Sequence, residues 1–170
     1  MDLASLIRDV PDFPKPGIIF KDITPLLQQP EAFHYVVDVM TERYRGQQVD
    51  VVAAVESRGF IFGAPIAYLL NAALVPVRKL GKLPAASLSI EYALEYGTNT
   101  LEIHRDAITP GQRVLVVDDL LATGGSVAAT VQLITGLGGV VAGIAFLVEL
   151  TFLNGRSRLA NHDVFALIQY

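Results

Sequence analysis

The sequence predicts an α/β fold, with a mainly parallel, twisted sheet flanked by helices. Short uncharged runs rich in β-branched residues alternate along the chain with longer segments of helical spacing. The run Val114–Val117 is apolar at every position, which is typical of a strand buried on both faces of a parallel sheet. Strands that alternate with helices form βαβ units, so the carboxyl ends of these strands are expected at one edge of the sheet.

The individual elements follow from local composition. Residues 1–12 are expected to form a short amphipathic helix, and residues 13–17, with two prolines and a glycine, a rigid extended connection. Segment 83–99 carries no strong helix signal. Apolar spacing and β-branched runs predict the remaining elements: helix Pro30–Arg45, strand Val51–Val55, helix Phe60–Leu70, strands Leu74–Val77, Leu101–His104 and Val114–Val117, helix Val127–Ile134, and strands Val140–Val148 and Phe165–Ile168.

Composition narrows the class of protein. The length of 170 residues indicates a single domain, 1–170, that buries about two-thirds of its unfolded surface. The chain has no cysteine, which excludes a disulfide framework and fits a cytoplasmic location. Seventeen acidic against 13 basic residues argue against nucleic acid as a partner. The uncharged stretch Leu120–Val148 contains glycines and polar residues, so we expect a helix, a turn and a buried strand there, and no membrane span.

The segment that follows strand Val114–Val117 is the most informative part of the chain. A turn of small residues leads from Ala122 to Ser126 into the next helix. The first N–H groups of a helix have no partner within it, and together with the helix dipole they favour an anion. Gly124 and Gly125 allow close approach of a phosphate, while Thr123 and Ser126 add hydroxyl donors. No lysine follows the glycines, so this is not a Walker A loop.

Two carboxylates precede this turn. Asp118 and Asp119 would repel a phosphate, but they suit the hydroxyl groups of a sugar or the surroundings of a divalent cation. A ligand with a phosphate and free hydroxyls, such as ribose 5-phosphate, fits both halves of the segment. From the residues alone, an ordinary strand-to-helix turn with a serine N-cap remains open.

Cationic side chains follow two other predicted strands. Arg58 lies just after strand Val51–Val55 and has the geometry to bind a phosphate through two hydrogen bonds. Arg78, Lys79 and Lys82 come directly after strand Leu74–Val77. Because these strand ends share an edge, the four cations favour a second anionic group beside the first. A surface arginine capped by Glu56 and a solvated basic loop remain alternatives on composition.

Two segments suggest contacts with another part of a ligand. Phe20, in an apolar run beside the rigid turn, could stack on a flat ring, and core packing is the alternative. Segment 84–99 is longer than an ordinary connection between two elements, and loops of this length often serve as lids over a site. The three histidines are scattered and show no metal-ligand spacing, so we expect them to be structural.

Five ordered segments resemble the type I phosphoribosyltransferases, and among these the members that use adenine. The matching segments are Phe13–Leu27, Glu56–Phe60, Arg78–Pro84, Leu94–Gly97 and Asp118–Ser126. The resemblance implies an enzyme of purine salvage that transfers the 5-phosphoribosyl group from phosphoribosyl pyrophosphate to adenine, giving AMP and pyrophosphate. It also implies a Mg²⁺-dependent homodimer in the cytoplasm, with Mg²⁺ held mainly by the substrate and no metal bound directly by the protein.

The resemblance assigns roles to residues. It makes segment 84–99 a flexible hood and implies catalytic residues Glu95, Arg58 and Tyr96, with Glu95 handling a proton near the base. Pyrophosphate would be bound by Arg58, Arg78, Lys79 and Lys82, often with a non-proline cis peptide before the arginine. The ribose 5-phosphate would be bound by Asp118, Asp119, Ala122, Thr123, Gly124, Gly125 and Ser126. Adenine would lie against Ile19, Phe20, Lys21 and Leu150.

One departure from the family is visible, since Ser126 stands where many relatives have threonine; both carry the hydroxyl. Two alternatives remain open. The first is the same reaction on a 6-oxo purine, which would need a donor at its carbonyl; the one lysine near the expected base site is Lys21. The second is a non-catalytic regulator that senses phosphoribosyl pyrophosphate. Such proteins usually add a DNA-binding domain and a basic face, and the sequence shows neither.

Overall fold

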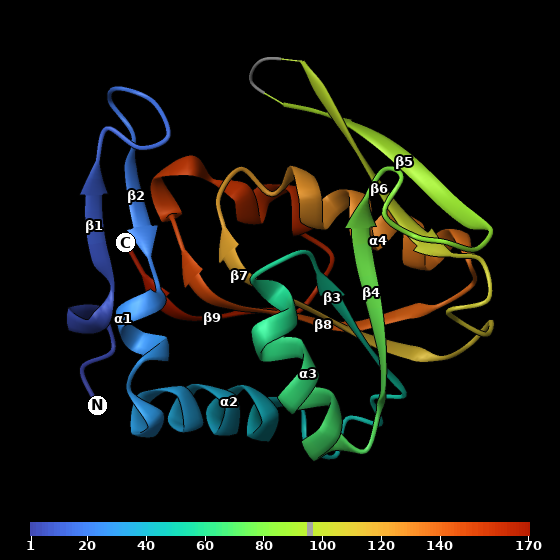
Figure 1. Cartoon of the computed structure of the whole chain (residues 1–170). Coiled ribbons are helices and arrows are strands. Elements are labelled where there is room, and N and C mark those ends of the chain that lie inside the picture. Colours follow the sequence, from blue (N-terminus) through green and yellow to red (C-terminus); the bar gives the residue numbers. More distant parts are fainter. Residues whose placement is uncertain (95–96) are drawn as a thin grey trace. The chain divides into compact units, whose positions relative to one another are not determined.

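The computed structural model describes residues 1–94 and 97–170 (Figure 1). The chain forms two compact units, residues 1–39 and residues 40–170. The prediction of one domain over the whole chain stays a prediction. Among the described residues, no helix is long and apolar enough to cross a membrane.

The first unit is built around a two-stranded antiparallel sheet. Its elements are a 3₁₀ helix η1 (Ala4–Leu6), strands β1 (Arg8–Pro11) and β2 (Ile19–Asp22), helix α1 (Thr24–Leu27) and the start of α2 (Pro30–Tyr44). The predicted helix over residues 1–12 is therefore wrong. Charged side chains pair across the two strands, Arg8 with Asp22 and Lys21 with Asp9, each at 2.6 Å. These pairs join positions 14 and 12 residues apart, so no local pattern reveals them.

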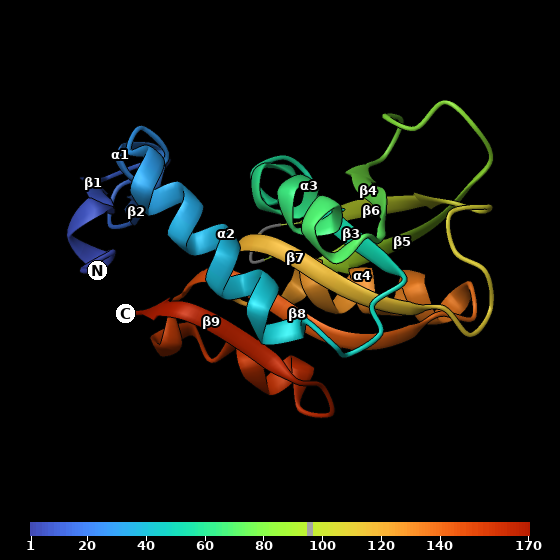
Figure 2. The ribbon, with the colours of Figure 1, turned by 90° about the horizontal axis from the view of Figure 1, so that it is seen from below.

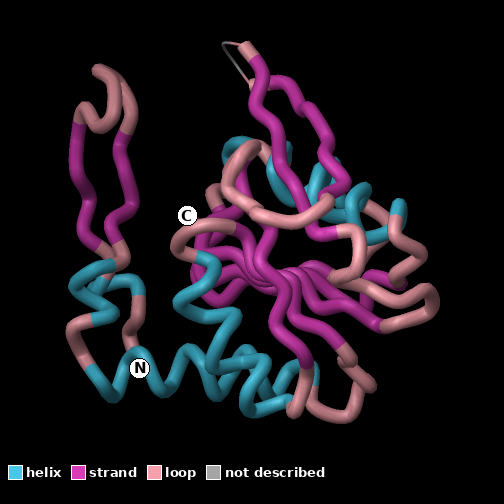
Figure 3. The backbone as a smooth tube through the Cα atoms, turned by 45° about the vertical axis from the view of Figure 1, so that its right-hand side comes forward, coloured by secondary structure: helices cyan, strands magenta, loops and turns pink. Residues whose placement is uncertain are grey.

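The second unit contains a seven-stranded sheet with the strand order β5-β6-β4-β3-β7-β8-β9. The strands are β3 (Val51–Val55), β4 (Ala73–Lys79), β5 (Ser87–Ala93), β6 (Thr98–His104), β7 (Arg113–Leu121), β8 (Val140–Glu149) and β9 (Val164–Gln169). The helices are α3 (Gly59–Leu70), α4 (Gly125–Gly136) and the 3₁₀ turns η2 (Thr151–Leu153) and η3 (Gly155–Leu159). Figure 3 shows the twist of the strands across the sheet.

The predicted mainly parallel sheet flanked by helices is confirmed. Strands β4, β3, β7, β8 and β9 are parallel to one another, whereas β6 runs antiparallel to β4 and β5 antiparallel to β6. Strand β5 occupies part of the predicted hood segment and was not expected. Its alternating polar and apolar residues are the period-two pattern of a strand with one covered face. The β5–β6 hairpin extends past the carboxyl ends of the parallel strands (Figure 1).

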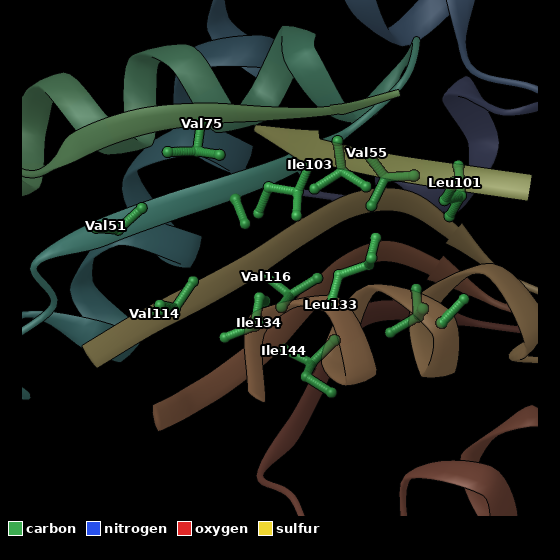
Figure 4. Packing of buried hydrophobic residues seen from close by; sticks show 14 of the residues in the cluster. Val51, Val55, Val75, Leu101, Ile103, Val114, Val116, Leu133, Ile134 and Ile144 are labelled. Atoms are coloured by element: carbon green, nitrogen blue, oxygen red, sulfur yellow. The ribbon is translucent and has the colours of Figure 1, made fainter. Parts of the chain in front are cut away.

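The helices α3 and α4 cover opposite faces of the sheet (Figure 2). On one face, Leu133 and Ile134 of α4 pack in one buried apolar cluster with alternate residues of the strands, among them Val116 and Ile144 (Figure 4). On the other face α3 lies so close to β3 that a Cβ atom on Gly63 would be 2.5 Å from the Cβ of Ala54. Burial on both faces explains why β3 and the stretch Val114–Val117 of β7 are uninterrupted apolar runs.

The carboxyl ends of β4, β3 and β7 lie side by side, because these strands are neighbours in the sheet and parallel. Strand β7 is longer than the predicted Val114–Val117, since it continues to pair with β8 as far as Leu121 opposite Glu149. Asp118 and Asp119 therefore belong to the last part of the strand. Helix α4 begins at Gly125, just beyond it.

Candidate active site

A cavity of about 340 Å³ lies at the carboxyl edge of the three neighbouring strands. The loop after β3, the end of β4, the end of β7 and the start of α4 each contribute to its walls. Its lining residues are Glu56, Ser57, Arg58, Lys79, Asp118, Asp119, Leu120 and Ser126. Thus the structure brings together the acidic pair, two of the predicted cations and one residue of the predicted phosphate loop.

Glu56 organises the cationic wall of this cavity. Its backbone N–H donates to the carbonyl of Val77 at 2.9 Å, which fixes the end of β3 against β4. Its carboxylate Oε1 accepts from Nε of Arg78 at 3.1 Å and from the backbone N–H of Lys79 at 2.8 Å. Hence Glu56 holds the end of β4 in place. Arg78 does not line the cavity, but its side chain is oriented by Glu56, which does.

Arg58 connects the loop after β3 to the acidic pair. Its Nε donates to Oδ2 of Asp119 at 2.5 Å, and about 40% of the side chain remains exposed. The loop reaches β7 because the next residue is glycine: a Cβ on Gly59 would lie 2.9 Å from the carbonyl oxygen of Val117. The peptide bond between Glu56 and Ser57, one residue before Arg58, is cis.

The two carboxylates of β7 have different environments. Asp119 is buried and paired with Arg58, whereas Asp118 is buried with its Oδ1 accepting the backbone N–H of Asp119 at 2.8 Å. Burial, reinforced by the charge of Asp119, raises the pKa of Asp118 well above its usual range. A site that destabilises its own carboxylate favours a ligand that supplies hydrogen-bond donors or a cation to it.

The turn from Ala122 to Ser126 has the geometry expected of an anion site. Gly124 is the N-cap of α4 with φ +84°, a left-handed conformation that favours glycine. The amino end of the twelve-residue helix α4 therefore begins at the edge of the cavity, where Ser126 lines it. Gly125 is also close-packed, since a Cβ there would lie 3.3 Å from Cδ2 of Tyr92 in β5.

The other predicted site residues lie as follows. Lys82 is in the turn after β4 and is not among the lining residues. Glu95 and Tyr96 lie outside the described residues. Next to them, the N–H of Leu94 donates to the carbonyl of Gly97 at 2.9 Å, which closes the β5–β6 hairpin.

The residues predicted to meet a base belong to both units. In the first unit, Phe20 lies edge-on to Phe13 with ring centroids 5.3 Å apart, and Lys21 forms its ion pair with Asp9. Ile19 is exposed on β2, which forms one outer edge of its two-stranded sheet. In the second unit, Leu150 is nearly buried just after β8, with its N–H donating to the carbonyl of Leu121 at 2.9 Å.

Several contributors to the site received no individual role from the sequence. Ser57 and Leu120 line the cavity, and Gly59 permits the close approach of two loops. Gly155 was also missed, although its backbone lies against the phosphate turn from a distant part of the chain. A glycine after an asparagine is an ordinary turn signal, so nothing local distinguishes Gly155 from other turn glycines.

Comparisons with known proteins show the family to which the chain belongs. The family model of the phosphoribosyl transferase domain matches residues 22–165, so the chain belongs to the phosphoribosyltransferase family. It is 64% identical to the adenine phosphoribosyltransferase of Chloroflexus aurantiacus over 99% of this chain and 98% of that protein. These matches confirm the resemblance stated for the five segments.

The fold is also similar to solved structures of the same group of enzymes. The adenine phosphoribosyltransferase of Thermoanaerobacter pseudethanolicus superposes with a TM-score of 0.96 at 54% identity, covering 99% of this chain and 98% of that one. The enzyme of Saccharomyces cerevisiae, solved with adenine and an imino-altritol bisphosphate, gives a TM-score of 0.92 at 39% identity. That comparison covers 98% of this chain and 96% of the yeast chain.

Proposed function

We propose that this chain transfers the 5-phosphoribosyl group of phosphoribosyl pyrophosphate to adenine, giving AMP and pyrophosphate in purine salvage. The observation that carries the proposal is the cavity in which Asp118 and Asp119, Arg58 and Lys79, and Ser126 meet. A sugar with an anionic group at each end needs these three kinds of partner. The relatives are adenine phosphoribosyltransferases over nearly their full length, which supports adenine as the acceptor.

In this reaction N9 of adenine forms a bond to C1′ of the ribose while the bond from C1′ to pyrophosphate breaks. Pyrophosphate leaves with the bonding electron pair, adenine releases the N9 proton, and positive charge builds on the ribose ring. The protein contributes by holding the reactants in line and by neutralising the departing charge. Glu95, with Tyr96 beside it in the sequence, would receive or relay the released proton from the hood.

The cavity divides these tasks among its walls. The turn of Ala122, Thr123, Gly124, Gly125 and Ser126 would hold the 5′-phosphate through backbone N–H groups and hydroxyls. Asp118 and Asp119 would accept hydrogen bonds from the ribose hydroxyls. Pyrophosphate would meet Arg58 and Lys79 directly, with Arg78 and Lys82 nearby. Because Glu56 orients both Arg78 and the backbone of Lys79, that cationic wall is formed before the substrate binds.

A divalent cation suits the acidic side of the cavity. Among the described residues there is no cluster of three or more ligands of the kind that alone binds a metal ion. The adjacent carboxylates of Asp118 and Asp119 line the cavity and are oxygen donors of the kind that Mg²⁺ shared with a substrate prefers. When bound with pyrophosphate, Mg²⁺ would neutralise charge on the leaving group. We therefore propose Mg²⁺ as the cofactor, held mainly by the substrate.

The alternative acceptors have less support. Lys21, the lysine that a 6-oxo purine would need as donor, is ion-paired with Asp9 at 2.6 Å. The yeast relative was solved with adenine. The adenine reaction is thus favoured over a 6-oxo purine, and over a regulator that only senses phosphoribosyl pyrophosphate. Contacts from Ile19, Phe20, Lys21 and Leu150 to the base remain part of the proposal.

The exposed face of α3 supports a homodimer. Tyr68 is 84% exposed, and Ile61, seven residues earlier on the same helix face, is also exposed, with Leu69 beside Tyr68. Large apolar side chains grouped on a surface mark an interface more often than scattered ones do. We propose that a second copy of the chain covers this face. A cytoplasmic location stays a prediction.

A Mg²⁺-dependent assay with phosphoribosyl pyrophosphate and each purine base in turn tests the proposal. Wild-type protein should form AMP and pyrophosphate with adenine, and the Glu95→Gln variant should be slower by about a hundredfold or more. Turnover with a 6-oxo purine in place of adenine would contradict the acceptor. Binding of phosphoribosyl pyrophosphate without turnover on any base would contradict catalysis and favour the sensor.

A further inference from the structure

An ion pair between a buried carboxylate and a half-buried arginine closes the segment that follows β8. Glu149, the last residue of β8, is only 4% exposed, and Arg156 lies seven residues further on. Nε of Arg156 donates to Oε1 of Glu149 at 3.0 Å, and Nη2 donates to Oε2 at 2.5 Å. This two-point geometry is available to arginine and not to lysine. The pair joins both ends of the intervening turn, Leu150 to Gly155.

The same arginine also ties the turn to the last strand of the sheet. Its Nη1 donates to the carbonyl of Val164 in β9 at 2.7 Å, and Gln169 of β9 donates to Oε2 of Glu149 at 3.2 Å. The hydrogen bonds from Arg156 hold the pKa of Glu149 below its ordinary value, which keeps the carboxylate charged and the pair intact at neutral pH. The position of Arg156 is therefore set by two strands.

The residue next to Arg156 lies directly against the phosphate turn. Gly155 is buried, and a Cβ on it would be 2.2 Å from the carbonyl oxygen of Ala122 and 3.0 Å from the backbone nitrogen of Gly124. From the other side, a Cβ on Gly124 would be 2.6 Å from the carbonyl oxygen of Gly155. The two backbones are in direct contact, with no space for a side chain between them.

We propose that the Glu149–Arg156 ion pair positions the 5′-phosphate turn by holding the backbone of Gly155 against Ala122–Gly124. The proposal rests on the function assigned above to that turn. The N–H groups of a phosphate site bind tightly only when they are fixed before the ligand arrives, because otherwise part of the binding free energy is spent on ordering them. Neither Glu149 nor Arg156 lines the cavity, so their effect is exerted through Gly155.

The variants Arg156→Lys and Glu149→Gln test this role. Lysine keeps the charge but loses the two-point contact, and glutamine keeps the shape but places an N–H₂ group opposite an arginine donor. We expect the Kd for ribose 5-phosphate and the KM for phosphoribosyl pyrophosphate to rise by about tenfold. The Kd for inorganic pyrophosphate, whose proposed partners are Arg58 and Lys79, should stay within about twofold, and so should kcat once the substrate is saturating.

Arg158→Lys is the matched control, because Arg158 lies exposed in the same 3₁₀ turn. It should bind both ligands as the wild type does. Circular dichroism and thermal melting identify any variant that does not fold. If Arg156→Lys or Glu149→Gln fails to fold, the other of these two variants provides the test. The proposal is overturned if a folded variant binds ribose 5-phosphate normally, or if it loses both ligands equally. A wild-type protein that does not bind ribose 5-phosphate would instead refute the function assigned to the turn.

Discussion

Asp118 shows how a single residue combines a binding role with a cost in stability. The carboxylate is buried beside a second one, and burial together with the charge of Asp119 raises its pKa. Arg58 is paired with Asp119, so the compensating charge is directed mainly at the neighbour. In the free protein the charged form of Asp118 is therefore poorly stabilised, and a ligand that brings hydroxyl donors or a cation would stabilise it.

Asp118→Asn should consequently stabilise the free protein in a pH-dependent way. A raised folded-state pKa gives stability that is fully present below the ordinary pKa of 3.8 and is lost as the pH rises through the folded-state value. The asparagine variant does not lose this stability as the pH rises, because its side chain carries no charge. Its Oδ1 can still accept the hydrogen bond from the N–H of Asp119. We expect the Tm to match the wild type near pH 4 and to exceed it by a few degrees near pH 8.

Asp106→Asn is the control for this prediction, because it makes the same charge change at an exposed position. Its Tm should follow the wild type at every pH. A difference between Asp118→Asn and the wild type that is constant with pH would show that the burial of Asp118 does not act through its charge.

At the scale of elements, most strands of the large sheet and the helices that cover it could be predicted from the sequence. The two strands that are joined by ion pairs between distant residues could not. Strand β3, helix α3, helix α4 and strand β8 follow from apolar runs and spacing, because burial on both faces of the sheet requires them. Strands β1 and β2 escaped prediction, since they are stabilised by ion pairs between distant residues. Strand β5 was not predicted because it lies within the segment interpreted as a hood.

The packing of α3 on β3 gives an element-scale prediction. A Cβ on Gly63 would overlap the side chain of Ala54 at 2.5 Å, so Gly63→Ala should lower the free energy of unfolding by about 1–3 kcal/mol, as overpacking does. Urea denaturation measures the loss. The double variant Ala54→Gly with Gly63→Ala should recover part of it, because the overlap is removed.

Gly136→Ala provides the comparison for this packing test. The new Cβ would meet only the end of the flexible Leu88 side chain at 3.0 Å, so we expect little change in stability. If Gly63→Ala proved as stable as Gly136→Ala, the close approach of α3 to the sheet would be wrong.

For the whole molecule, most residues that line the cavity could be predicted from the sequence. The contacts that hold those residues in place could not. The acidic pair, Arg58, Lys79 and Ser126 were predicted because each lies at a strand end or helix start, where topology alone brings them to one edge. The links from Glu56 to Arg78 and from Gly155 to the phosphate turn could not be predicted, because they depend on side-chain direction and on contacts between distant backbones.

The proposed dimer gives a prediction at this scale. Tyr68→Lys places a charge on the exposed face of α3 and should shift the protein from dimer to monomer, since burying an unpaired charge is costly. Sedimentation velocity over a range of concentrations measures the change. Tyr35→Lys, which alters an exposed aromatic residue on α2, should remain dimeric. A wild-type protein that sediments as a monomer throughout would refute the dimer.

The most direct test of the central claim is a crystal structure of the protein with AMP bound. We expect the 5′-phosphate to accept hydrogen bonds of about 3 Å from the backbone N–H groups of the turn Ala122–Ser126. The ribose hydroxyls should face Asp118 and Asp119. A phosphate bound instead at Arg58 and Lys79, or outside this cavity, would contradict the assignment of the two anion sites and the proposed function that depends on it.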